Sequence, residues 1–220
     1  MHVVLFGSGK GGVGKSTLAA NVAYALATRI KTLLMDFSAF DKTSTSMLVP
    51  GCVSKFGVYD WLFYFREAMG VVPEIETCER RDVLLEVLPP GSMEEAVQTL
   101  SYSVLAKRVK TLMDMMIKHF SIVIVDYPGR SIHTDPLLQA LMSHVDHLII
   151  VMEPTEASTA EARALFNFAT QRYDPPPVVS SILNKYAGEK VLLELRSAGG
   201  FVEKVPLIGE VMALGRNPHL

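Results

Sequence analysis

Short apolar runs alternate with longer segments in which apolar residues recur at helical spacing, and this alternation predicts the fold class. The short runs read apolar almost throughout, as strands do when both faces of a sheet are covered. Helical patterns separate them, for example over Val104–Lys118 and Ala157–Gln171. We therefore expect an α/β fold with a doubly wound, mostly parallel sheet and helices on both faces. The predicted strands are Val3–Phe6, Lys31–Met35, Val83–Leu88, Ser121–Val125, His147–Met152, Val178–Leu183 and Phe201–Val205.

Polar residues stand at the carboxyl ends of several predicted strands. Asp36, Asp126 and Asn184 each follow such a strand directly. In open α/β sheets ligands bind at this edge, so we expect the three side chains to lie near the loop after the first strand.

That loop carries the strongest chemical signal in the chain. Gly9–Ser16 fits the phosphate-loop pattern G-x-x-x-x-G-K-[ST], between the first strand and a helix predicted over 16–28. Glycines allow the backbone N–H groups to surround phosphate oxygens, and the following helix N-terminus favours negative charge. Lys15 is expected to reach the β- and γ-phosphates, and the Ser16 hydroxyl to bind Mg²⁺. A glycine-rich turn without ligand is disfavoured, because spacing, lysine, hydroxyl and context agree.

Composition narrows the function classes. The 220 residues are 49% hydrophobic and 20% charged, which predicts one ordered domain over 1–220. The formal net charge of −2 excludes a basic field over the whole surface that would attract nucleic acid. The sequence opens directly in a strand and contains no apolar run long enough to span a bilayer, so we expect a cytoplasmic protein.

The cysteines give little guidance. Cys52 and Cys78 lie far apart, without a C-x-x-C pair, so we expect two ordinary thiols. One cysteine per chain contributing to a site shared between subunits stays open as an alternative.

The two-lysine loop 10–17 closely resembles the deviant Walker A motif of the ParA/MinD family of ATPases. The resemblance extends over almost the whole chain through weaker motifs in the right order. Those segments are Asn21 in the first helix, Leu33–Asp36, Val58–Leu62, Leu85–Pro89, Phe120–Gly129 (similar to Walker B plus switch II), Ile182–Lys185 and Val205–Pro206.

This resemblance implies binding of Mg·ATP and a face-to-face dimer that encloses two nucleotides. Lys10 would then cross to the partner's nucleotide, and slow hydrolysis, stimulated by an activator protein, would release the dimer. The resemblance implies roles for these residues: catalytic, Lys10, Lys15, Asp36 and Asp126; nucleotide-binding, Gly9, Gly11, Gly12, Val13, Gly14, Lys15, Ser16, Thr17, Asn184 and Pro206; metal-binding, Ser16, Asp36 and Asp126.

Simpler structural roles stay open for three of these residues. Lys10 would then be a solvated loop lysine, Asp126 a turn or cap aspartate, and Asn184, expected at the adenine edge, an Asx turn.

Two departures from the family pattern matter. Ser38 stands where the family has a second aspartate, and a serine cannot take a proton from the attacking water at neutral pH. We therefore expect intact ATP binding and very slow hydrolysis, unless Asp41 substitutes. The segment 214–218 resembles the one before the family's last helix, so we expect the MinD-type membrane-targeting helix to be missing and membrane binding to be unlikely for this chain.

The leading hypothesis is an ATP-dependent dimerisation switch in DNA partitioning or in positioning a cellular structure. The alternatives are a nucleotide-bound scaffold with little hydrolysis and a metallocentre maturation ATPase. Non-specific DNA binding is possible, although the candidate basic residues are interspersed with acidic ones. Those residues are Arg163, Arg172, Lys185, Lys190, Arg196, Lys204 and Arg216.

An aromatic cluster over 56–65 is interpreted first as a helix in the core and second as a partner or dimer surface.

Overall fold

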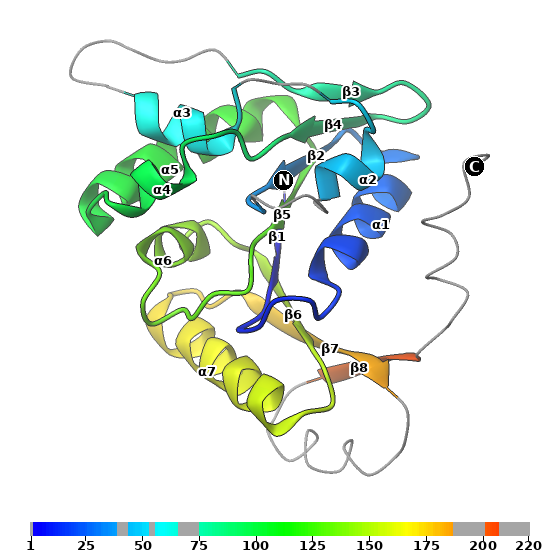
Figure 1. The fold of residues 1–220 in the computed structure, drawn as a ribbon, viewed down its shortest axis with the longest axis vertical. Coiled ribbons are helices and arrows are strands. Elements are labelled where there is room, and N and C mark those ends of the chain that lie inside the picture. The colour runs from blue at the N-terminus through cyan, green and yellow to red at the C-terminus, as the bar shows by residue number, and fades with distance from the viewer. Residues whose placement is uncertain (1, 39–43, 53–55, 66–74, 187–200, 207–220) are drawn as a thin grey trace.

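The computed structural model describes residues 2–38, 44–52, 56–65, 75–186 and 201–206, with side chains left out at 185–186 and 201–206. Its centre is an eight-stranded sheet whose neighbouring strands are parallel, except that β3 runs antiparallel to β4 (Figure 1). In sheet order the strands are β3 (Cys78–Arg80), β4 (Leu85–Leu88), β2 (Thr32–Asp36), β5 (Ile122–Asp126), β1 (His2–Gly7), β6 (His147–Met152), β7 (Val178–Tyr186) and β8 (Phe201–Pro206).

Helices cover both faces of this sheet, which confirms the predicted fold class (Figure 1). One face carries α1 (Lys15–Ala27) and α2 (Ser44–Leu48). The other carries α3 (Val58–Tyr64), α4 (Glu94–Gln98), α5 (Tyr102–His119), α6 (Pro136–Met142) and α7 (Glu156–Arg172).

The two-residue period of β1 builds the two halves of the core. Val3 and Leu5 belong to the core cluster that includes residues of α3 and α5–α7, whereas Val4 and Phe6 belong to the cluster that includes residues of α1. All four side chains are buried, so this apolar strand is covered on both faces as its sequence predicts.

The site position follows from the strand order. β1 lies between β5 and β6, and the chain leaves β1 toward β2 but later returns past it to β6. The loop after β1 leaves the carboxyl edge of the sheet at the point where the strand order reverses. This is the position at which open α/β sheets bind ligands.

The aromatic cluster is mainly core. Tyr59, Trp61 and Phe65 are buried, while Tyr64 is 43% exposed and stacks on Phe56. Within the described part of the chain, no helix is both long and apolar enough to cross a bilayer.

Candidate functional site

The glycine-rich loop joins the end of β1 to the start of α1 and is shaped by left-handed backbone. Gly12 and Gly14 have φ values of 76° and 96°, which favour glycine. Val13 between them is buried and anchors the loop in the core. The Ser8 hydroxyl donates to the Lys10 carbonyl over 2.6 Å and stabilises the turn.

The first turn of α1 is left open for an anion. Its N-cap residue is Gly14, which has no side chain to cap the helix, and its first turn contains no acidic residue. The unpaired N–H groups and the positive end of the helix dipole therefore face the loop, with Ser16 and Thr17 half-buried beside them. This arrangement suits a phosphate group.

Lys15 is a buried cation within this arrangement. Burial lowers the pKa of its ammonium, and the nearby Asp126 carboxylate partly opposes that effect. A desolvated ammonium attracts phosphate oxygens more strongly than a solvated one.

Asp126 at the end of β5 is a fully buried carboxyl with the Ser16 and Ser44 hydroxyls beside it. Neither of its oxygens accepts a hydrogen bond of normal geometry in the described part of the chain. Burial and the neighbouring Asp36 raise the pKa of Asp126 to about 6, while the Ser16 and Ser44 hydroxyls and Lys15 lower it. Such a carboxyl gains much from a cation placed beside it.

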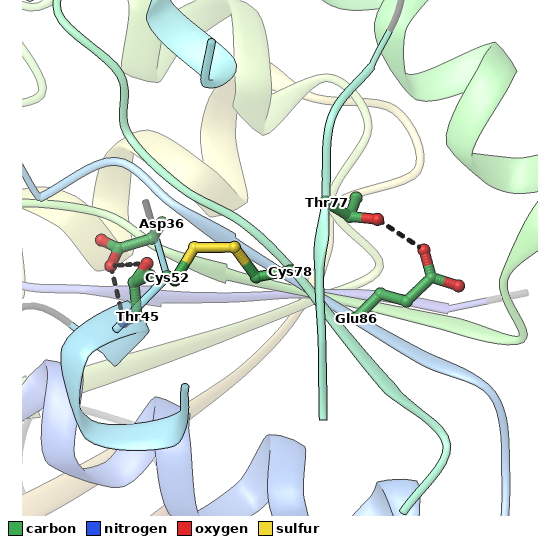
Figure 2. Close-up of a disulfide and its surroundings, with 6 residues drawn as sticks. All are labelled: Asp36, Thr45, Cys52, Thr77, Cys78 and Glu86. Atoms are coloured by element: carbon green, nitrogen blue, oxygen red, sulfur yellow. Dashed lines mark hydrogen bonds between the residues drawn. A yellow bond between two sulfur atoms is a disulfide. The ribbon is translucent and has the colours of Figure 1, made fainter. Parts of the chain in front are cut away.

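Asp36 lies directly opposite Asp126 in the β2–β5 register, and its oxygens are already engaged (Figure 2). One accepts from the Ser38 N–H at 2.9 Å. The other accepts from the N–H of Thr45 at 2.8 Å and from its hydroxyl at 2.6 Å. The predicted metal and catalytic residue is thus brought to the site, where it holds the first turn of α2 and adds negative charge near Asp126.

The donor set fits Mg²⁺ bound together with phosphates. Among the described residues no three His, Cys, Asp or Glu side chains form a metal cage. Mg²⁺ needs no such cage, because it keeps several waters and takes one or two protein oxygens plus substrate phosphates. The unpartnered Asp126 oxygens and the Ser16 hydroxyl at the start of α1 supply that kind of partial shell.

Lys10 makes an ion pair within its own chain. Its Nζ lies 3.5 Å from Oε2 of Glu153, which follows β6, and its side chain is 52% exposed. Its backbone contacts the segment after β5: a Cβ added to Gly129 would lie 2.4 Å from the carbonyl carbon of Lys10. The phosphate loop and the predicted switch II are therefore in direct contact.

Asn184 contacts the phosphate loop, although its predicted partner was the adenine edge. Its amide donates to the Val13 carbonyl over 2.8 Å, and a Cβ on Gly14 would lie 2.2 Å from the same nitrogen. Asn184 thus ties β7 to the loop. Pro206 ends β8 opposite Tyr186, and its side chain lies outside the described residues.

The expectation of two ordinary thiols is wrong. Cys52 and Cys78 form a disulfide with Cα atoms 5.9 Å apart, which joins the segment after α2 to the edge strand β3 (Figure 2). Sequence reasoning missed this pairing because β3 is only three residues long and was not predicted as a strand. A disulfide also removes both thiols as ligands for a shared metal site.

Other contacts at the site were missed as well. Ser44 and Thr45 lie at the start of α2, and Glu161 of α7 packs against Gly9. The Ser–Thr pair before a short apolar run is a helix-start signal that could have indicated α2, whereas Glu153 and Glu161 had no sequence signal.

The AAA_31 family model, described as an AAA domain, matches residues 1–174. The chain belongs to this family. It is a P-loop ATPase of the ParA/MinD type.

Relatives agree with this assignment. An uncharacterized ATP-binding protein of Methanocaldococcus jannaschii is 27% identical over 220 residues, covering 99% of this chain and 75% of that protein. The ParA family ATPase of Chlorobium tepidum has a TM-score of 0.75 at 22% identity, covering 97% of this chain and 87% of the other. MinD of Pyrococcus horikoshii, solved with Mg-ADP, has a TM-score of 0.71 at 18% identity, covering 97% and 86%. Both solved structures share the fold.

Proposed function

We propose that this ATPase is an ATP-dependent dimerisation switch that acts in DNA partitioning or in positioning a cellular structure. The observation that carries the proposal is a phosphate loop with two lysines, set against an open helix N-terminus and the buried, unpartnered carboxyl of Asp126. The relatives' names support ATP as the nucleotide and these two cellular roles, since they include an ATP-binding protein, a plasmid partition protein and a septum site-determining protein.

The residues divide the work by position. The loop amides at 11–14 and the start of α1 bind the phosphates, and Lys15 neutralises phosphate charge. Ser16 and Asp126 would hold Mg²⁺, which supplies charge neutralisation for phosphoryl transfer when bound. Lys10 is exposed enough to exchange Glu153 for a phosphate of the partner's nucleotide.

Hydrolysis is expected to be slow without an activator protein. Ser38 is buried beside Asp36, and its hydroxyl offers no charge to an attacking water. Ser38→Asp should raise ATP turnover, since a carboxylate can orient or deprotonate that water. An unchanged or lower phosphate-release rate would contradict this explanation.

The decisive experiment is solution mass by light scattering with Mg·ATP and with Mg·ADP, for wild type and Lys10→Ala. The proposal requires a dimer that forms with ATP only and is weakened by the substitution. A monomer in both states, or a dimer indifferent to nucleotide, would exclude the switch.

A nucleotide-bound scaffold with little hydrolysis is the second candidate, and Ser38 favours it. It predicts a nucleotide-dependent dimer whose ATP turnover stays negligible when candidate partners or DNA are added. The metallocentre alternative loses its main support because Cys52 and Cys78 are bonded to each other.

A further inference from the structure

We propose that the Ser44 hydroxyl is a second protein hydroxyl of the magnesium site, facing Ser16 across Asp126 and contacting the ion or one of its waters. This inference rests on the proposed function, because it assumes that the site binds nucleotide with Mg²⁺. It assigns a metal-site role to α2, an element without any predicted role in the site.

The first argument is burial. Ser44 has no exposed surface, and its Oγ makes no hydrogen bond in the described part of the chain. Buried hydroxyls nearly always have a partner, because an unpaired one loses its hydrogen bond to water without replacement. The Ser44 hydroxyl lies beside the Asp126 carboxyl and lowers its pKa as a hydrogen-bond donor, yet the pair does not reach normal hydrogen-bond geometry, so both groups can accept a better polar partner.

The second argument is that the Ser44 hydroxyl and the Asp126 carboxyl lie at the same place in the fold. Within the described ranges, the buried side-chain oxygens and nitrogens without a hydrogen bond are Ser44 Oγ and the two carboxylate oxygens of Asp126. These atoms belong to one location, since the Ser44 hydroxyl lies close enough to influence the Asp126 carboxyl. Three unsatisfied oxygens that converge are the ligand type that Mg²⁺ prefers.

The third argument is that the fold fixes Ser44 there. The next residue, Thr45, is held to Asp36 by two hydrogen bonds (Figure 2). Asp36 lies opposite Asp126 in the register of β2 and β5. The helix α2 also packs on α1, which carries Ser16 in its first turn. Ser44 is thus positioned by the same elements that position the phosphate loop.

A purely structural role explains Ser44 less well. A serine at a helix start usually accepts a hydrogen bond from a backbone N–H of the first turn, and Ser44 Oγ accepts none among the described residues. Thr45 makes the contacts that hold the helix start, whereas the Ser44 hydroxyl is directed to the Asp126 carboxyl, at the place expected for the metal.

The test compares ATP affinity with Mg²⁺ and with EDTA, measured by calorimetry on wild type, Ser44→Ala and Ser46→Ala. Mg²⁺ should raise the ATP affinity of Ser44→Ala about tenfold less than it raises that of wild type, because losing a contact around a metal commonly weakens binding by about this factor. The ATP affinity in EDTA should be unchanged. Ser46 is exposed on the same helix and is the matched control.

Two results would overturn the role of Ser44: a full Mg²⁺ gain in Ser44→Ala, or an equal loss of affinity in Mg²⁺ and EDTA. Wild type that binds no ATP in either condition would instead contradict the proposed function itself. The two failures are therefore distinguishable.

Ser44→Cys provides an independent readout if the alanine variant does not fold. A thiol is a poor ligand for Mg²⁺ and a good one for soft cations, so the variant should gain ATP affinity with Cd²⁺ but not with Mg²⁺. Ser46→Cys should keep the Mg²⁺ preference. A Ser44→Cys protein with unchanged Mg²⁺ preference would place the side chain away from the metal.

Discussion

At the scale of single residues, the least favourable charge of the site is the carboxylate of Asp126, because burial and the neighbouring Asp36 disfavour its ionised form. Its carboxylate is buried and unpartnered, with Asp36 opposite it and the buried Lys15 as the nearby cation. The chain without ligand therefore carries an unfavourable charge that a bound cation would relieve.

This cost predicts a pH dependence of folding. Folding raises the pKa of Asp126 from 3.8 to about 6, so the folded chain binds more protons than the unfolded chain between these pH values. The contribution of this group to stability therefore falls as pH rises through that window, by roughly 3 kcal/mol in all. Without nucleotide and metal, Asp126→Asn should raise the melting temperature clearly at pH 7.5 and by only about a third as much at pH 4.5, near the start of that window. An equal effect at both pH values would contradict the assignment.

A second residue-scale prediction concerns the contact between Gly129 and the phosphate loop. A methyl group at Gly129 would lie 2.4 Å from the Lys10 carbonyl atoms and 2.7 Å from the Gly11 nitrogen, all of them backbone. Gly129→Ala should destabilise the ligand-free chain by about 1–3 kcal/mol in urea unfolding, as overpacking does. Gly11→Ala, which has nothing within 4 Å of its Cβ, should have little effect on stability.

The sequence predicted the loop residues well but not their neighbours. The loop pattern has a fixed spacing, so Ser16 could be placed at the start of a helix from the chain alone, and α1 begins one residue earlier, at Lys15. Glu153 and Asn184 reach the loop only through tertiary packing, and their contacts there depend on distances that no local pattern encodes.

At the scale of elements, α2 is a short helix held at both ends. Asp36 binds its first turn through Thr45, and Nη1 of Arg80 donates to the Leu48 carbonyl at its last residue over 2.8 Å. The disulfide then ties Cys52, four residues after the helix end, to the start of β3. A five-residue helix has little stability of its own, so these contacts determine its position.

The disulfide should therefore contribute strongly to stability. Its cysteines are 26 residues apart in sequence. Closing a loop of that length lowers the entropy of the unfolded chain, which raises the free energy of unfolding by roughly 3–4 kcal/mol. The double variant Cys52→Ser/Cys78→Ser should unfold at correspondingly lower urea concentration than the oxidised protein. Wild type in strong reductant should match the variant; a midpoint unchanged by both would exclude a structural role.

The elements themselves were predicted from periodicity where they are long or fully apolar. α5 and α7 and the buried strands were found, although β4 begins at Leu85, two residues later than expected. The elements without a prediction, β3, α2, α4 and α6, are only three to seven residues long, so tertiary contacts outweigh their local sequence preferences.

At the scale of the whole molecule, the segment after β5 connects the nucleotide edge to the helices on one face. Arg130 forms ion pairs with Glu94 of α4 and with Asp135, which caps α6, and the Tyr127 hydroxyl donates to the same Asp135 over 2.8 Å. A change at the γ-phosphate that moves Gly129 would therefore also displace α4 and α6 through these contacts.

The Lys10–Glu153 pair predicts how the proposed dimer is tuned. Forming the proposed dimer would break the Lys10–Glu153 ion pair, which at this exposure stabilises the single chain by at most about 1 kcal/mol. Glu153→Gln removes this cost, so it should tighten ATP-dependent dimerisation about two- to fivefold. Glu156→Gln, the same charge change in the first turn of α7, is the matched control. Weaker dimerisation of Glu153→Gln, measured by light scattering, would show that Glu153 supports the dimer instead.

The same pair turns assembly into an exchange of partners for one ammonium group. In the proposed dimer, Lys10 would give up a carboxylate of its own chain as it gains a phosphate of the other, and salt would weaken both contacts. Part of the ionic-strength dependence therefore cancels. The wild-type dimer should dissociate less steeply with added salt than the Glu153→Gln dimer, so that assembly follows nucleotide concentration more closely than the salt content of its surroundings.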